Sequence, residues 1–402
     1  MIRNLLVTAA TSALLCGAAF AQSAMQNDQA QFGDVFGAMT VGVGHADDAA
    51  SSAVTGGNVA TMSAKNHSAA IDSAQSTHGA ARAASTLSFG RVNGVAASAA
   101  YGFGNGFTAS AERGDLTVNA NQNADNGADV SADSHLTGHL NGPGAVATTG
   151  ATAAVNAANI AADRGDVTAD ITQKSTANTD ARASGGVTAC CGSASAGAVA
   201  SANNIATSGT TSTLIADTRQ ASAGDHVNAR ASLAISHGAS VVVAAATANG
   251  NAATFVNAWG YVQTNVAQTN ASAIDATAVV TGDAWGAASS SAYGVGNTVS
   301  TTNIGSDTRA SYDQDNSGGV RAEATLTGSG GVGVATSTAI GNASNAFLCT
   351  TCGAGDLHGA NRQSNSGGID AVGTLSMPTA SSAVGAANAF GNAATFQVGP
   401  GG

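Results

Sequence analysis

The sequence predicts an all-β protein, a repetitive β-solenoid (β-helix-like) built from repeats of about 47 residues. Three observations lead to this prediction. The composition is dominated by small side chains, three series of residues recur in register along the chain, and the segments between them alternate with period two. Because no such segment could bury a face alone, stacked repeats are the expected architecture.

The composition limits the kind of core that the chain can build. Of 402 residues, 44% are hydrophobic but only 4% are aromatic, and there are 52 glycines and 3 prolines. Most of the apolar share is alanine, whose methyl group contributes little when burial yields about 25 cal/mol per Å2. A thick globular core is therefore not expected. Disorder is not expected either, because the chain is neither strongly charged nor rich in proline.

The N-terminus reads as a secretory signal. Residues 1–21 contain an early basic residue, Arg3, then an apolar stretch and Ala19-Phe20-Ala21, which predicts cleavage after Ala21. A lipoprotein signal at Cys16 is disfavoured because Leu15, the residue before it, is not small. Residues 22–50 fit the repeat poorly and are interpreted as an N-terminal arm or cap. Residues 51–402 are predicted to form a β-solenoid of about seven to eight repeats.

Recurring residues define the repeat. A glutamine in a polar run returns about every 47 residues, at Gln75, Gln122, Gln173, Gln220, Gln268, Gln314 and Gln363. An asparagine among small residues keeps the same period, at Asn58, Asn105, Asn159, Asn204, Asn251, Asn297, Asn342 and Asn392. A bulkier apolar residue forms the third series, at Leu87, Leu136, Val187, Leu233, Val279, Leu326 and Leu375.

One unit, from Ala96 to Gly144, illustrates the local pattern. Small residues alternate in AASAAYGFGN, LTVNANQ follows a Thr/Ser segment, and Asp125-Asn126-Gly127 marks a turn. This predicts about four short strands per unit. The number of strands per coil stays open, because about 47 residues could form one large coil or two of about 23 each.

The glutamine series has two interpretations. Amide side chains at equivalent sites of stacked strands can form ladders along the axis, and the recurring glutamines are our ladder candidates. Alternatively, the glutamines and asparagines lie at loop tips and face water. We favour at least one internal ladder.

Four cysteines remain after signal removal, and they fall into two local pairs. Cys190 and Cys191 are adjacent, and Cys349 and Cys352 are separated by two threonines. In an oxidising compartment these pairs are candidates for local disulfides. A zinc site is disfavoured, because adjacent cysteines lack ligand spacing.

No catalytic residue, metal site or cofactor is predicted. Asp313-Gln314-Asp315-Asn316-Ser317-Gly318 resembles the start of a calcium loop, but the twelfth position is Ala324 instead of Glu. His135 and His139 have helical zinc spacing within a segment that alternates like a strand. Trp259 and Trp285, with Tyr261 and Tyr293, could stack on sugar rings or pack inside the repeat. A net charge of −11 argues against nucleic acid as a partner.

The chain resembles the holdfast attachment protein D family of stalked and budding alphaproteobacteria. The resemblance rests on the signal MIRNLLVTAATSALLCGAAFAQ, the following QSAMQNDQAQFGDVFG, and the small-residue repeats through AFGNAATFQVGPGG. It implies a structural protein, associated with the outer membrane at the cell surface, that anchors an adhesive polysaccharide called the holdfast. It also implies holdfast attachment proteins A and B as partners, with direct or indirect contact to the polysaccharide, and leaves self-association open.

Two other functions remain as alternatives. A self-assembling, curli-like amyloid fibre subunit would share the amide ladders. A β-helix carbohydrate-active or carbohydrate-binding protein would use residues from neighbouring coils, although the acidic residues are scattered over turns.

Overall fold

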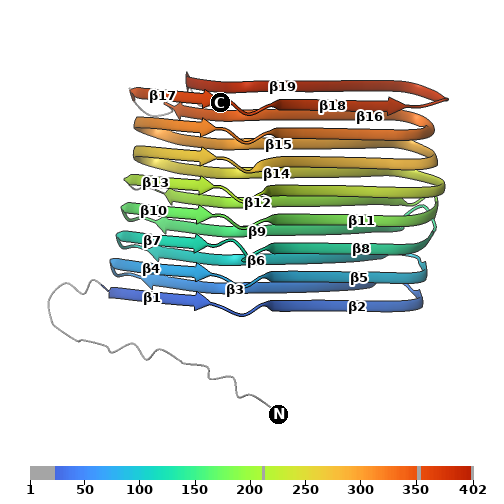
Figure 1. Ribbon diagram of the computed structural model, residues 1–402, viewed down its shortest axis with the longest axis horizontal. Coiled ribbons are helices and arrows are strands. Elements are labelled where there is room, and N and C mark those ends of the chain that lie inside the picture. The colour runs from blue at the N-terminus through green and yellow to red at the C-terminus, as the bar shows by residue number, and fades with distance from the viewer. Residues whose placement is uncertain (1–22, 211–212, 351–354, 400–402) are drawn as a thin grey trace, which may run out of the picture.

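The computed structural model describes residues 23–210, 213–350 and 355–399, and within these ranges the chain forms nineteen β-strands and no helix. The strands pair in parallel from coil to coil, and the coils stack into one column (Figure 1). The prediction of an all-β solenoid is thus confirmed. The predicted signal peptide, residues 1–21, lies outside the described residues.

Each coil contains three strand positions, which we call first, second and third. First strands are β1 (Ser23–Gln31), β4 (Ala69–Thr77), β7 (Leu116–Ala124), β10 (Val167–Ser175), β13 (Leu214–Ser222) and β17 (Leu357–Asn365). Second strands are β2 (Val35–Ala46), β5 (Ala81–Val92), β8 (Val130–Asn141), β11 (Thr179–Cys190) and β18 (Ile369–Ser376). Third strands are β3 (Ala49–Lys65), β6 (Val95–Glu112), β9 (Val146–Asp163), β12 (Ser193–Thr210) and β19 (Ala380–Gly399).

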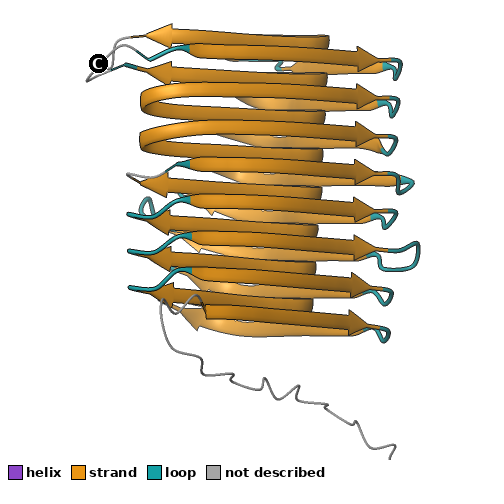
Figure 2. Cartoon of the chain, turned by 90° about the vertical axis from the view of Figure 1, so that its left-hand side faces the viewer, coloured by secondary structure: helices purple, strands orange, loops and turns teal. Residues whose placement is uncertain are grey.

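Three longer strands complete the stack by running through corners without a break. They are β14 (His226–Asn270), β15 (Ala273–Asn316) and β16 (Val320–Cys349). Two of these corners appear as unbroken ribbons in Figure 2. β14 and β15 each supply a second, a third and the next first strand, as their pairing partners show.

The third strand bends where its inside-outside alternation changes phase. In β6, Gly104 and Asn105 are consecutive and both buried. The next coil passes very close, since a Cβ on Gly104 would lie 2.7 Å from the Val155 carbonyl oxygen. Glycine before the asparagine therefore suits the bend. A unit thus has three strands, one of them bent, where the sequence pattern predicted about four short ones.

The third strand crosses behind the first two (Figure 1). The interior between them holds two apolar clusters. Second strands pack against the N-terminal half of the third strand, around Leu87, Leu136 and Leu326. First strands pack against its other half around Ile160, Ile205 and Phe255. Many of the remaining buried residues are alanines, so the two layers lie close together.

The apolar series needs two corrections. In the observed register Leu136 pairs with Gly185, and Leu233 pairs with Val280, so Val187 and Val279 do not belong to the row. Gly185 breaks the pattern because a Cβ there would lie 2.7 Å from Leu233 Cδ2. The neighbouring leucine fills this space, which is why the row continues structurally without a bulky residue in that coil.

Residues 23–46, which the sequence pattern assigned to an arm or cap, form β1 and β2. These strands pair in register with β4 and β5. The segment therefore builds the first coil of the same stack. The repeat continues through it, because Gln29 pairs with Gln75 and Val41 with Leu87.

Candidate functional site: the amide rows and the ends of the stack

The recurring glutamines form one continuous hydrogen-bonded row inside the stack. Gln122 Nε2 donates to Gln75 Oε1 at 2.8 Å, and Gln173 Nε2 donates to Gln122 Oε1 at 2.7 Å. The same contact joins every later member, and Gln29 of the first coil precedes Gln75. From Gln75 to Gln314 the side chains are no more than 2% exposed, so they lie in the interior and not at loop tips.

Each glutamine also ties the two layers of its coil together. The second proton of Gln122 Nε2 reaches the Ala157 carbonyl of β9, and Gln173 reaches the Asn204 carbonyl of β12. A buried primary amide has two donors and one acceptor oxygen to satisfy. The row uses both donors, so these polar side chains stabilise the interior instead of penalising it.

An asparagine row runs beside the glutamine row, at the bend of the third strand. Its members are Asn58, Asn105, Asn156, Asn203, Asn251, Asn297, Asn342 and Asn392. Asn159 and Asn204, which the sequence pattern indicated in two repeats, are not members. The sequence signal fails there because Val155 and Ala202 replace the glycine that precedes most of the other members.

The two rows have opposite hydrogen-bond directions. Each asparagine donates its Nδ2 to the asparagine of the following coil, as Asn203 does to Asn251 at 2.8 Å. Each glutamine donates its Nε2 to the glutamine of the preceding coil, as Gln220 does to Gln173 at 2.9 Å. The paired residues lie 45 to 51 positions apart, so one turn of the column joins them.

The rows end with unused groups, and the two ends of the stack differ. At the C-terminal end, Asn392 Nδ2 and Gln363 Oε1 have no hydrogen-bond partner among the described residues. At the N-terminal end, Asn58 Oδ1 accepts no bond within the described ranges, and Gln29 Nε2 donates only to the Val59 carbonyl. For these two rows, each end thus presents one amide donor and one amide acceptor along the axis.

The terminal strands are also open on one side. β17, β18 and β19 pair with the preceding coil, and within the described residues nothing covers their other edge. β1, β2 and β3 are open in the opposite direction. Unpaired edges of this kind are templates for another strand.

The cysteines lie at corners of the coils. Cys190 and Cys191 are exposed, with sulfur atoms 3.6 Å apart, and Cys191 has a φ of 73°. The pKa of Cys191 is raised from its ordinary value, chiefly by its hydrogen bond to Cys190. Cys349 is buried at the end of β16, and Cys352 lies outside the described residues.

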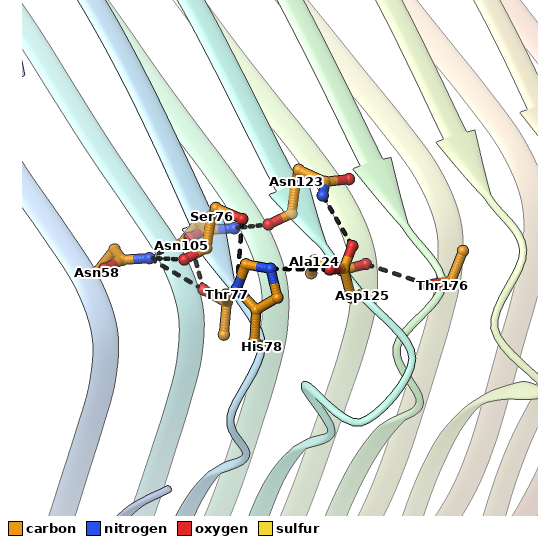
Figure 3. A network of polar contacts seen from close by, with 9 residues as sticks. All are labelled: Asn58, Ser76, Thr77, His78, Asn105, Asn123, Ala124, Asp125 and Thr176. Atoms are coloured by element: carbon orange, nitrogen blue, oxygen red, sulfur yellow. Dashed lines mark hydrogen bonds and ion pairs between the residues drawn. The ribbon is translucent and has the colours of Figure 1, made fainter. Parts of the chain in front are cut away.

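A second polar network ties the turns of adjacent coils (Figure 3). His78 Nε2 lies 3.0 Å from Asp125 Oδ2, Asn123 Nδ2 donates to Asp125 Oδ1 at 2.8 Å, and Ser76 Oγ lies 3.5 Å from His78 Nδ1. Serine, histidine and aspartate are residues of hydrolytic triads. Here the serine contact is at the limit of hydrogen bonding, and the His78 and Asp125 side chains are 37% and 46% exposed. We interpret the network as a link between turns.

The other candidate residues do not converge. His135 Nδ1 lies 2.9 Å from Ser184 Oγ on the outer surface of β8 and β11. No group of three or more potential metal ligands occurs within residues 23–210, 213–350 and 355–399. In the calcium-like segment, Gln314 belongs to the glutamine row and Ala324 is buried in β16.

The tryptophans occupy different corners. Trp285 is 4% exposed and packs in the cluster beneath the second strands, whereas Trp259 is 52% exposed at a corner within β14, with a φ of 67°. They do not form one aromatic platform. A shallow groove of about 520 Å3 crosses the first strands near Gln263, Arg309 and His358, which are neighbours in register.

Parallel coils tied by buried amide rows define this chain as a structural β-solenoid. The family model for Holdfast attachment protein D matches residues 43–319, which is more than half of the chain. The chain therefore belongs to the holdfast attachment protein D family. No curated protein and no solved structure matches it.

Family membership implies a role in holdfast anchoring and an association with the holdfast machinery. It also suggests a location in the envelope or at the cell surface. Among the described residues, no helix has the length and apolar character needed to cross a membrane.

Proposed function

We propose that this protein is a structural anchor that fixes the adhesive polysaccharide to the cell envelope and so mediates adhesion to surfaces. The observation that carries the proposal is the unbroken column of parallel coils joined by two internal amide rows. An anchor under load must resist separation at every level. This column meets that need without a wide hydrophobic core.

The strength of the column comes from many small contributions at each neighbour interface. β12 and β9 alone pair from Ser193 to Thr210 opposite Val146 to Asp163, and every such interface includes one bond from each amide row. A net hydrogen bond contributes about 1 kcal/mol, so separating two coils means breaking a long series of bonds together. Summed nearest-neighbour interfaces are the basis of stability in repeat proteins.

The finer features of the role are part of the same proposal. The signal peptide, residues 1–21, exports the chain, which then associates with the outer membrane and faces the surface. Holdfast attachment proteins A and B are its partners, and its contact with the polysaccharide is direct or passes through them. It acts as a structural element and not as an enzyme.

The cysteines fit an exported protein. We propose that Cys349 and Cys352 form a local disulfide, and that Cys190 and Cys191 can close a vicinal one by rotation of their side chains from the present 3.6 Å separation. Mass spectrometry of unreduced peptides from the native host tests both pairs. Free thiols at all four positions would contradict this part of the proposal.

The anchoring role is tested in the native host. The gene is deleted and complemented with a tagged copy, and both the tagged protein and the labelled adhesive are followed in cells and medium. We expect the protein to fractionate with the outer membrane, and its loss to release adhesive into the medium. Adhesive that stays attached to cells lacking the protein would refute the proposal.

Two variants test whether anchoring needs the intact column and not only the presence of the protein in the envelope. Asn203→Leu removes a central member of the asparagine row, whereas Asn388→Asp changes an outward residue of β19. We expect the first to release adhesive and the second to retain it, with both proteins quantified in the envelope fraction.

A further inference from the structure

The two ends of the stack carry complementary amide groups. Asn392 Nδ2 at the C-terminal end is a free donor, and Asn58 Oδ1 at the N-terminal end is a free acceptor of the same row among the described residues. The glutamine row is reversed, with the acceptor Gln363 Oε1 at the C-terminal end and the donor Gln29 Nε2 at the other. Opposite row directions thus give each end the partner groups of the other end.

We propose that the C-terminal end of one copy docks on the N-terminal end of a second copy, head to tail, so that the coils continue across the junction. This inference goes beyond the anchoring role and does not depend on it. In the register of the stack, β17 would lie beside the second copy's β1, β18 beside its β2 and β19 beside its β3. Asn392 would then donate to Asn58, and Gln29 to Gln363.

Side-chain volumes at the two ends also fit. Continuing the apolar row places Leu375 beside Val41 of the second copy. Both residues are half-buried, and within one chain both pack against the cluster beneath the second strands. The same register places Phe396, 37% exposed, beside Met62. At another position of the junction a large residue meets a small one, since Met39 would lie beside Gly373. Apolar side chains that a terminal coil leaves exposed would thereby be covered.

One charge pair marks the same junction. Arg362 on β17 is 82% exposed and lies 3.8 Å from Asp313 of the preceding coil. The next member of this outward row on a docked copy is Asp28 of β1, also exposed. The arginine would therefore lie between two aspartates, one from each copy. Within one chain this row already holds such a cross-coil pair, so the junction would repeat a contact that the fold uses.

Head-to-tail docking is favoured over docking of two like ends. A two-fold contact between like ends would set the terminal strands antiparallel, whereas head-to-tail docking continues the parallel pairing that joins the coils of the column. A contact between unlike ends leaves a free end on every copy. Such heterologous contacts do not close, so copies would add in a line and form a filament with the width of one coil.

The charge pair provides a rescue experiment. Asp28→Arg and Arg362→Asp are made separately in the full exported chain, and association is measured by sedimentation over a concentration series. Each variant opposes like charges at its own junctions, and we expect about tenfold weaker association at low salt. Mixed in equal amounts, the two variants place the new arginine of one beside the new aspartate of the other at one junction. The native pair forms at the next junction, so association should return.

The amide rows provide a stronger test. Asn392→Asp keeps an oxygen for Asn342 Nδ2 but replaces the free donor by an acceptor that would face Asn58 Oδ1. We expect association to weaken at least about 30-fold, because a polar group without a partner is costly in a buried contact. Asn249→Asp makes the same substitution on the outward side of β14, and Arg219→Asp changes the charge row, both in the middle of the stack. Both controls should associate like the native chain.

The outcomes separate cleanly. Loss in the single variants, rescue on mixing and insensitivity of the controls support head-to-tail docking, as do filaments one coil wide in electron micrographs. A native chain that stays monomeric up to about 1 mM overturns it. So does association that neither end variant weakens, because the copies would then meet through their sides.

Discussion

A coil in the middle of the column and a coil at its end carry the same glutamine and asparagine at the positions of the two amide rows, yet the environments of these residues differ. Gln173 and Asn203 are completely buried, and each is bonded to a member of its row on both sides. Gln363 and Asn392 occupy the equivalent positions in the last coil, where Asn392 is exposed. The stability of a polar row therefore belongs to the interface between neighbours and not to the coil itself.

This difference divides the molecule into parts with different functions. In the middle coils the members of both amide rows are bonded on both sides, so there the rows stiffen the column. End coils carry unused donors, acceptors and strand edges, so they are the places where the column can fray or bind. Substitutions at equivalent positions in the two regions should separate these properties.

The largest expected difference comes from the asparagine row. Asn203→Leu leaves one of the two protons of Asn156 Nδ2 without its acceptor, and Asn251 Oδ1 and the Ala221 carbonyl without their donor. We expect a loss of about 4 kcal/mol in the free energy of unfolding, since each unsatisfied buried group costs about 1–3 kcal/mol. Denaturant unfolding gives the loss, and hydrogen exchange should place it in β12 and β14.

The matched variant is Asn392→Leu in the last coil. Water can replace the lost amide there, so a cost below about 1 kcal/mol is expected. Equal losses in the free energy of unfolding of the two variants would show that the stabilisation by an asparagine of this row does not depend on having a neighbouring coil on each side.

A smaller difference is expected in the apolar row. Leu136 is 1% exposed and Leu375 is half-buried in the last coil, although both belong to one row. Leu136→Ala should cost about 3 kcal/mol, because it removes buried methyl groups and leaves a cavity, and Leu375→Ala about 1 kcal/mol. A ratio near one would contradict the view that end coils are only partly packed. Thermal and denaturant unfolding of both variants measure it.

The sequence alone predicted the solenoid class because period-two alternation and recurring polar residues are local signals. The register of the glutamine series could also be read, since every member from Gln75 to Gln363 is a glutamine. The asparagine and apolar rows were misassigned in two repeats each. Val155 and Ala202 occupy the glycine position before the true asparagines, and Gly185 leaves its space to Leu233.

Other features depend on contacts that no single repeat contains. The opposite directions of the two amide rows arise from side-chain orientation across the coil, as for Gln122 toward Ala157. The placement of Trp259 and Trp285 at different corners depends on where each coil turns. Similar motifs that lie near each other in the sequence therefore do not imply that their side chains share one surface.

A buried tyrosine near the C-terminal end should make that end sensitive to alkali. Tyr312 is 2% exposed and donates its hydroxyl to Thr301 Oγ1 at 2.7 Å, and burial raises its pKa to about 12. In the unfolded chain a tyrosine titrates near pH 10. The contribution of Tyr312 is therefore complete below about pH 10 and is lost as the pH rises through about 12.

We expect a loss of about 2 kcal/mol near pH 12, confined first to the coils around β15 and β17. Absorbance titration of the phenol and hydrogen exchange at increasing pH would follow it. Tyr312→Phe should remove this alkaline step while the N-terminal coils behave as in the native chain. An unchanged step in that variant would assign the effect to another group.

The smallest effect is expected from an ion pair on the outside of the first two coils. Lys65 and Glu112 are paired across β3 and β6 at 2.9 Å, with side chains 70% and 38% exposed. The Lys65 ammonium, through its hydrogen bond and charge, lowers the pKa of the Glu112 carboxyl from its ordinary value. Any stabilisation is therefore present above that ordinary value and is lost as the pH falls through the lowered one. Lys65→Met should return the Glu112 pKa, measured by NMR titration, toward its usual range without a measurable change in unfolding midpoint, because water and salt screen exposed pairs. A clear drop in the midpoint would show that outer charges, and not only the buried rows, hold the coils of this column together.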